Sequence, residues 1–174
     1  GKRINNKLSE LNIKSNFIKG LRVTDDKTIN IVEDVLIEFN KEIINALKDL
    51  SCGAKGITSK EYNIISVKTE SKDLGFVGTP NKIKTNVLNE IIKANQVPVV
   101  APLGINEKKQ TFNINADTAA GAIAKELNAR RLLIISDVEG VLDKNKKLIT
   151  EINSKKAKEM INNGIISGGM IPKI

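Results

Sequence analysis

The sequence predicts a layered α/β fold, and three observations lead to that expectation. Segments with apolar residues at helical spacing alternate along the chain with short, continuous apolar runs. The run at residues 132–135, Leu-Leu-Ile-Ile, is apolar on both faces, which is typical of a parallel strand covered on both sides. The chain has 174 residues, 40% of them hydrophobic, and is therefore long enough to bury a substantial core. Helices layered on a sheet account for this pattern.

Two helices are expected in the first part of the chain. Residues 3–13 carry a helical apolar stripe, and residues 24–50 form a longer amphipathic segment. Thr24 is expected to cap the second helix, with Asp25 and Asp26 in its first turn, where negative charge is favourable.

Strands and one helix are expected in the middle of the chain. Residues 53–59 and 62–70 resemble short strands, and a glycine-containing turn follows the second. A helix is predicted over 81–95, and it leads into a buried strand over 96–104 that ends near Pro102.

The last part of the chain continues the alternation. We expect a helix within 113–129, a buried strand within 130–140, and a hairpin over 141–152 that turns at Lys144–Lys146. A short helix is predicted over 154–164, where Gly164 ends it.

The composition excludes several classes of protein. The net charge is +8, but only four of the 28 basic residues are arginines and aromatic residues make up 3%, which disfavours a nucleic-acid surface. Histidine is absent and Cys52 is the single cysteine, so Ser-His triads, disulfides and most zinc sites are excluded. No apolar run approaches the roughly 20 residues that span a bilayer, and the polar start does not resemble a signal peptide.

The segment "NINADTAAG" holds more polar side chains than a helix start requires. A single cap would suffice, and Asp117 or Thr118 could supply it. Asn113, Asn115 and Asp117 share one face if the segment is extended, and they could then orient a ligand or a lysine. The alternative is a helix cap with two asparagines in a loop.

A second polar segment, "SDVEGVLD", follows the predicted strand at 130–140. Ser136 and Asp137 could bind polar atoms of a nucleotide, and Val138 and Leu142 could flank its base. The alternative is a plain turn in which Gly140 adopts positive φ.

Two basic residues lie in distinctive surroundings. Lys173 follows Ser167, Gly168 and Gly169, where exposed backbone amides and a lysine could hold a phosphate, although the P-loop spacing is absent. Arg22 lies between apolar residues, where its guanidinium could bind a carboxylate with two hydrogen bonds. The alternatives are a solvated lysine and a partly buried structural ion pair.

Six segments together resemble the acetylglutamate kinase family of the amino-acid kinase superfamily: "GLRVTDDKT", "LGFVG", "VPVVAPLGI", "NINADTAAGAIAKELNA", "LLIISDVEGVLD" and "GIISGGMIPKI". They occur in the family's order across the whole chain. The resemblance implies a three-layer αβα sandwich with a mainly parallel central sheet. It also implies one incomplete kinase domain over 1–174, with an acetylglutamate-binding lobe over about 1–110 and the start of an ATP-binding lobe over about 111–174.

The activity implied by the resemblance is transfer of the ATP γ-phosphoryl group to the γ-carboxylate of N-acetyl-L-glutamate, a step of arginine biosynthesis. Arg22, Asn113 and Gly1 match positions that bind the acetylglutamate. Asp117 matches the aspartate that orients catalytic lysines, and Lys173 matches a lysine that stabilises the phosphoryl transition state.

The resemblance also places the nucleotide and the partners. Mg²⁺ is expected with ATP, held mainly by phosphate oxygens, and no protein residue is nominated as a metal ligand. A homodimer or an assembly of dimers is implied, in bacterial cytosol or, as an alternative, plastid stroma. Arginine inhibition and binding of a PII-type signal protein are left open. The residues that match the nucleotide site are Asp137, Val138, Glu139, Gly140, Val141, Leu142, Ile165, Ile166 and Ser167.

Compared with the family pattern, the chain lacks segments at both ends. A first strand with its own lysine, most of an HGGG loop and the elements after "PKI" have no counterpart here. Because one cationic stabiliser would be absent, we expect the 174-residue piece alone to be inactive, with a loss of about 10²-fold or more. Two rival functions remain, another carboxylate or carbamate kinase of the same superfamily and a non-catalytic small-molecule sensor.

Overall fold

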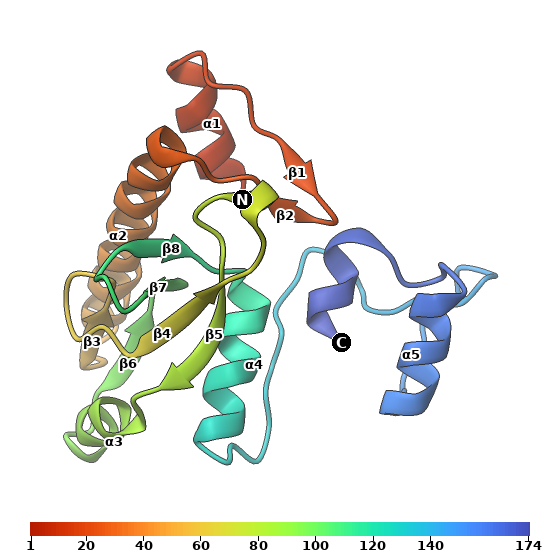
Figure 1. Ribbon diagram of the computed structural model, residues 1–174. Coiled ribbons are helices and arrows are strands. Elements are labelled where there is room, and N and C mark those ends of the chain that lie inside the picture. The colour runs from red at the N-terminus through yellow and green to blue at the C-terminus, as the bar shows by residue number, and fades with distance from the viewer. The chain divides into compact units, whose positions relative to one another are not determined.

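The computed structural model describes residues 1–174 and divides into two compact units, Gly1–Ala129 and Arg130–Ile174 (Figure 1). The expected boundary near residue 110 concerns the lobes that bind acetylglutamate and ATP, and it stays a prediction. None of the helices combines the length and the apolar character needed to cross a membrane.

The first unit alternates helices with short strands. In chain order it contains α1 (Lys2–Glu10), β1 (Phe17–Ile18), β2 (Leu21–Arg22), α2 (Asp26–Asp49), β3 (Ala54–Ile57), β4 (Ile65–Thr69), the 3₁₀ turn η1 (Lys72–Leu74), β5 (Gly78–Ile83), α3 (Thr85–Lys93), β6 (Val97–Val100), β7 (Leu103–Ile105), β8 (Thr111–Asn113) and α4 (Ala116–Glu126).

The strands form a mixed arrangement. β3 and β6 pair in parallel, β1 and β2 form an antiparallel hairpin, and a four-stranded sheet has the order β5-β4-β7-β8. Within that sheet only β4 and β7 are parallel. The predicted α/β class is confirmed, but the four-stranded sheet is mixed, whereas a mainly parallel sheet was expected. The helix expected over 81–95 starts only at Thr85, because residues 81–83 belong to edge strand β5, where Pro80 is tolerated next to a bulge.

Helices cover both faces of the strands, which gives the first unit three layers. One apolar cluster joins Ile4 and Leu8 of α1 to Val32 of α2 and to Leu103 of β7. The other, built around Ile65, joins α3 and α4 to the strands. Figure 1 shows α2 and α4 on opposite sides of the strands. The expected αβα layering is therefore present in this unit.

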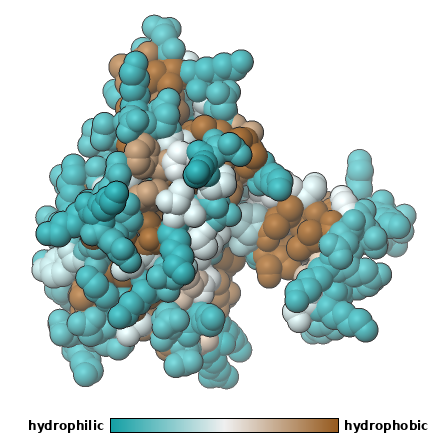
Figure 2. Space-filling view, viewed as in Figure 1, coloured by the Kyte–Doolittle hydropathy of each residue, from teal (hydrophilic) through white to brown (hydrophobic).

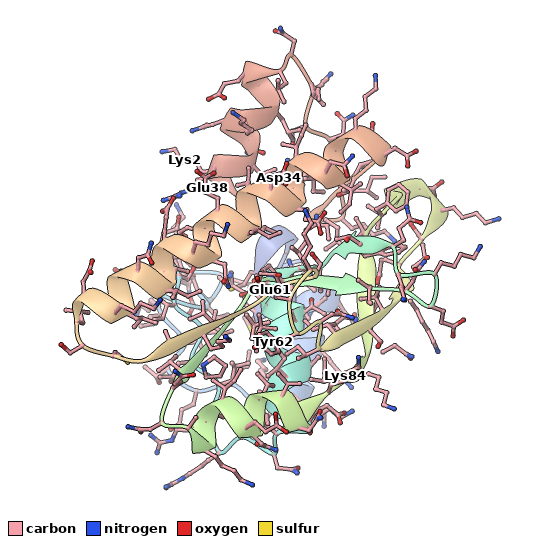
Figure 3. All side chains as sticks on the ribbon, turned by 90° about the vertical axis from the view of Figure 1, so that its left-hand side faces the viewer. Lys2, Asp34, Glu38, Glu61, Tyr62 and Lys84 are labelled. Atoms are coloured by element: carbon pink, nitrogen blue, oxygen red, sulfur yellow. The ribbon has the colours of Figure 1, made fainter.

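The long helix α2 is amphipathic, and its N-cap differs from the prediction. Asp25, not Thr24, caps it, because the Asp25 carboxylate accepts a hydrogen bond from the Thr28 backbone N–H at 2.8 Å. Thr24 lies one residue too early and is fully buried. Figure 3 shows Asp34 and Glu38 on the side of α2 that faces the viewer, and both are exposed.

The second unit contains α5 (Ser154–Asn162) and the 3₁₀ segment η2 (Gly168–Lys173), but no strand. The predicted strand at 130–140 is therefore wrong for this structure. Leu132, Leu133 and Ile135 are 45%, 81% and 95% exposed, and Figure 2 shows apolar surface on this unit. A strand needs a neighbour to satisfy its backbone, and this unit offers none.

Two other predictions for the second unit are confirmed. The segment 141–152 makes a hairpin, with an antiparallel bridge between Leu142 and Leu148. The Asp143 carboxylate accepts hydrogen bonds from two backbone N–H groups in its turn. The helix predicted over 154–164 is α5, which Asn153 caps.

Candidate active site

A cavity of about 460 Å³ in the first unit brings together four of the predicted site residues. Gly1, Arg22, Asn113 and Asp117 all line it, although they lie up to 116 positions apart in the sequence. Three structures meet there: the start of α1, the β1–β2 hairpin, and the junction between β8 and α4. Its volume is in the range of small-molecule sites, about 300–1,000 Å³.

The β1–β2 hairpin holds Arg22 in the cavity wall. The hairpin turns at Lys19 and Gly20, which both have positive φ, as a two-residue hairpin turn requires. Arg22 pairs across the hairpin with Phe17, whose ring centre is 4.7 Å from the guanidinium carbon. Arg22 is only 7% exposed, so a full positive charge is held close to the protein interior.

The partners of Arg22 are neutral. Its Nη2 donates a hydrogen bond to Asn5 Oδ1 at 2.7 Å, and its Nη1 donates to Ser15 Oγ. None of the ion pairs in the chain includes Arg22, so the structural ion pair considered from the sequence is not formed. Burial lowers the pKa of Arg22, but arginine stays protonated in proteins. The guanidinium therefore lacks a carboxylate partner, which a bound anion could supply.

Thr24 connects Arg22 to Asn113, and sequence reasoning missed this role. Its Oγ1 donates to the Arg22 carbonyl at 3.0 Å and accepts a hydrogen bond from Asn113 Nδ2 at 3.3 Å. The Thr24 side chain is thus the buried link that fixes two cavity residues against each other. Its position directly after "GLRV" was the available signal.

The backbone around Thr24 requires a glycine at position 75. The Phe76 N–H donates to the Thr24 carbonyl at 2.7 Å, and the Asn113 N–H donates to the Phe76 carbonyl at 2.9 Å. Gly75 has φ of +67°, and a Cβ there would lie 2.3 Å from the Thr24 carbonyl oxygen. Only glycine allows the backbone at position 75 to come this close to Thr24. The segment "LGF" therefore fixes the backbone of Thr24 relative to that of Asn113.

Three polar residues, Asn113, Asn115 and Asp117, lie at the start of α4 and have different roles. Asn115 is the N-cap, because its Oδ1 accepts from the Thr118 backbone N–H at 3.0 Å. The prediction that Asp117 or Thr118 caps the helix is therefore wrong. Asn113, Asn115 and Asp117 all line the cavity, although the segment is not extended, because Asn113 ends β8 and Asp117 lies in the first turn of α4.

Three features of the cavity favour an anionic ligand, although the Asp117 carboxylate also lines it. Arg22 supplies a positive charge, and the N-termini of α1 and α4 both lie at the cavity, with Gly1 and Asn115 as their caps. Helix N-termini present unpaired N–H groups and a partial positive charge. Such an arrangement can hold a carboxylate.

The other predicted site residues belong to the second unit. Lys173 is the last residue of η2. That Lys173 converges on one site with Arg22, Asn113 and Asp117 stays a prediction. Val138 and Leu142 are 50% and 39% exposed, while the Ile166 side chain is buried, and their contacts with a nucleotide stay a prediction. Nowhere in residues 1–174 do three His, Cys, Asp or Glu side chains gather where they could hold a metal ion.

The chain matches the amino acid kinase family over residues 1–174. It is 73% identical to an acetylglutamate kinase of Pelagibacter ubique over all 174 residues, which cover 60% of that protein. It is also 46% identical to an acetylglutamate kinase of Rhodospirillum centenum, covering the whole chain and 62% of that protein. The chain thus spans about 60% of the length of these relatives.

A solved structure supports the same relationship. The crystal structure of smu.665 from Streptococcus mutans UA159 superposes with a TM-score of 0.94 at 31% sequence identity. The match covers 99% of this chain and 71% of that one. The fold is therefore shared across most of a solved protein.

Proposed function

The chain belongs to the amino acid kinase family, and on that premise we propose that the protein phosphorylates N-acetyl-L-glutamate with ATP. The acceptor is the γ-carboxylate, and the product is N-acetyl-L-glutamyl 5-phosphate, an intermediate of arginine biosynthesis. The two relatives that are 73% and 46% identical to this chain are both named acetylglutamate kinase.

One observation carries the proposal: a buried guanidinium without a carboxylate partner faces a cavity of the right size. Arg22 is 7% exposed, and its hydrogen-bond partners Asn5 and Ser15 are neutral. Burial of an unpaired charge is costly, so a ligand carboxylate would relieve that cost. Forked pairing with carboxylates is the geometry in which arginine excels.

In this proposal the first unit recognises the acetylglutamate. Arg22 binds the α-carboxylate, and the Asn113 amide, fixed by Thr24, orients the acetylated backbone of the substrate. Gly1 lines the same cavity and would contribute backbone to the substrate site. Together these contacts would direct the γ-carboxylate toward the transferred phosphoryl group.

The second half of the proposal concerns phosphoryl transfer. A γ-carboxylate oxygen forms a bond to the γ-phosphorus of ATP while the bond from that phosphorus to the bridging oxygen of ADP breaks. Lys173 stabilises the charge on the transferred group, and Asp117 orients cationic groups around it. Alignment and charge stabilisation are the main contributions of a protein to this chemistry.

Nucleotide contacts, metal and assembly complete the proposal. The loop at 137–142 and the segment 165–167 are assigned to ATP, where Val138 and Leu142 have apolar surface available for a base. Mg²⁺ would be held mainly by phosphate oxygens, which suit its preference for hard ligands. A homodimer or an assembly of dimers and a cytosolic location, with the plastid stroma as the alternative, also belong to the proposal.

A coupled assay of ADP release on the full-length protein tests this function. N-acetylglutamate should be the preferred acceptor over glutamate, aspartate and carbamate. Faster turnover with an unacetylated acid or carbamate would instead identify a different kinase of the superfamily. Ligand binding without turnover would identify a sensor. The 174-residue piece alone should show little or no turnover.

A further inference from the structure

We propose that Asn5 is a positioning residue that holds Arg22 in place while leaving its charge uncompensated for the ligand. The carboxylate class of ligand follows from the site itself, whereas its identity as N-acetylglutamate rests on the proposed function. Asn5 lies on α1, outside the six segments quoted above for the resemblance to the kinase family.

The contacts of Asn5 define this role. Its Oδ1 accepts hydrogen bonds from Arg22 Nη2 at 2.7 Å and from Ser15 Oγ at 3.3 Å. Ser15 Oγ in turn accepts from Arg22 Nη1. The two guanidinium nitrogens are therefore anchored to α1 and to the loop that follows it, and Asn5 lines the same cavity as Arg22.

The neutral anchor of Arg22 contrasts with the partners of two nearby basic residues. Of the three basic residues on α1, Arg3 pairs with Glu42 at 2.6 Å and Lys7 pairs with Glu10 at 3.1 Å. Arg22, which is more buried than Arg3 and Lys7, is paired with an amide and a hydroxyl instead. An amide oxygen fixes the geometry of the guanidinium without neutralising it.

A carboxylate at position 5 would change the electrostatics with almost no change in shape. It would form an ion pair with Arg22 and would repel a ligand carboxylate in the same cavity. The substitution N5D therefore separates a positioning role from a purely structural one. A structural role predicts lower stability, whereas our proposal predicts weaker binding with stability kept or raised.

The test compares N5D with N6D in the full-length protein. Asn6 is the exposed next residue on α1 and lies outside the Arg22 cavity, so it controls for added charge on this helix. We expect N5D to raise the KM for N-acetylglutamate by about tenfold to a hundredfold, equivalent to about 1.4–2.8 kcal/mol. The kcat should change by less than about twofold, as expected for loss of uniform binding. N5S, which keeps a neutral acceptor, should partly restore the KM.

Calorimetric titration and thermal melting complete the test. If N5D and N6D bind N-acetylglutamate equally well, or if N5D lowers the melting temperature in proportion to its loss of binding, the inference is overturned. If the unchanged protein binds another carboxylate instead and N5D weakens that binding, the inference holds while the proposed function fails. If no carboxylate binds to the unchanged protein, both fail.

Discussion

The two units of the chain treat similar apolar residues in opposite ways. Leu88 in α3 of the first unit is 1% exposed, whereas Leu133 in the second unit is 81% exposed. Both come from segments whose apolar pattern predicts burial. A residue is buried only when another element packs against it, and the pattern of one segment does not contain that information.

The same contrast extends to backbone pairing. In the first unit each strand has a partner, and the register of β3 and β6 runs in parallel from Ala54 and Val97 onward. In the second unit the run 132–135 has the strand composition but no paired strand. The two units therefore differ more clearly in strand pairing than in the hydrophobicity of their sequences.

The largest expected effect compares one substitution in the two units. Leu88→Ala should destabilise the protein by about 2–5 kcal/mol, because it leaves a cavity in the core. Leu133→Ala should change stability by less than about 0.5 kcal/mol, as exposed substitutions do. Urea denaturation of both variants measures the difference. A Leu133→Ala variant as unstable as Leu88→Ala would show that residue 133 is buried in the folded protein, as the sequence pattern predicted.

A second contrast concerns chemistry: the proposed acetylglutamate contacts lie in the first unit and Lys173 in the second. Lys173→Met should lower kcat by about 10²–10³-fold, the typical cost of removing one electrostatic donor. The KM for N-acetylglutamate should stay within about threefold of its original value. Steady-state kinetics with Lys155→Met, an exposed lysine of α5, provides the control. A rise in the KM for N-acetylglutamate as large as the expected fall in kcat would assign Lys173 to substrate binding instead.

The complementary substitution lies in the first unit. Arg22→Lys keeps the charge but removes a charge-assisted hydrogen bond, so the KM for N-acetylglutamate should rise by about tenfold. The KM for ATP should change little. Arg131→Lys, at an exposed position, is the matched control. If Arg22→Lys changed only the KM for ATP, the division of roles between the units would be reversed.

The smallest expected effect compares two helix caps. Hydrogen bonds from the Thr28 side chain and backbone hold the pKa of the Asp25 carboxyl below its usual value. A lowered folded-state pKa contributes stability above the unfolded pKa, and that contribution is lost as pH falls through the folded pKa. Asp25→Ala should therefore cost about 0.5–2 kcal/mol at neutral pH and less in acid.

Asn153, which caps α5 in the second unit, has no charge to titrate. The cost of Asn153→Ala should be the same at neutral and acidic pH. Denaturation of both variants at the two pH values tests this contrast, and a pH-independent cost for Asp25→Ala would contradict it.

The helices were predictable from sequence because their signals are local. α2 and α5 lie within one or two residues of the predicted segments, and their apolar periodicity spans several turns. The strands β1, β2 and β8 were missed, since they have only two or three residues and no continuous apolar run. Strands this short form because a partner strand pairs with their backbone.

The site was predictable in its charged and amide residues but not in their supports. Arg22, Asn113 and Asp117 stand out in the sequence, and the cavity joins them. Asn5 and Thr24 carry ordinary helix and cap signals, so their contacts with Arg22 and Asn113 could not be read from spacing. Those contacts depend on how α1, the hairpin and β8 pack.

The most direct test of the account is a crystal structure of the full-length protein with N-acetylglutamate. We predict the α-carboxylate within hydrogen-bond distance of the Arg22 guanidinium, with Asn5 still in contact with Nη2 and Asn113 beside the acetylated amide. A ligand bound outside this cavity, or bound within it without contacting Arg22, would contradict the central claim.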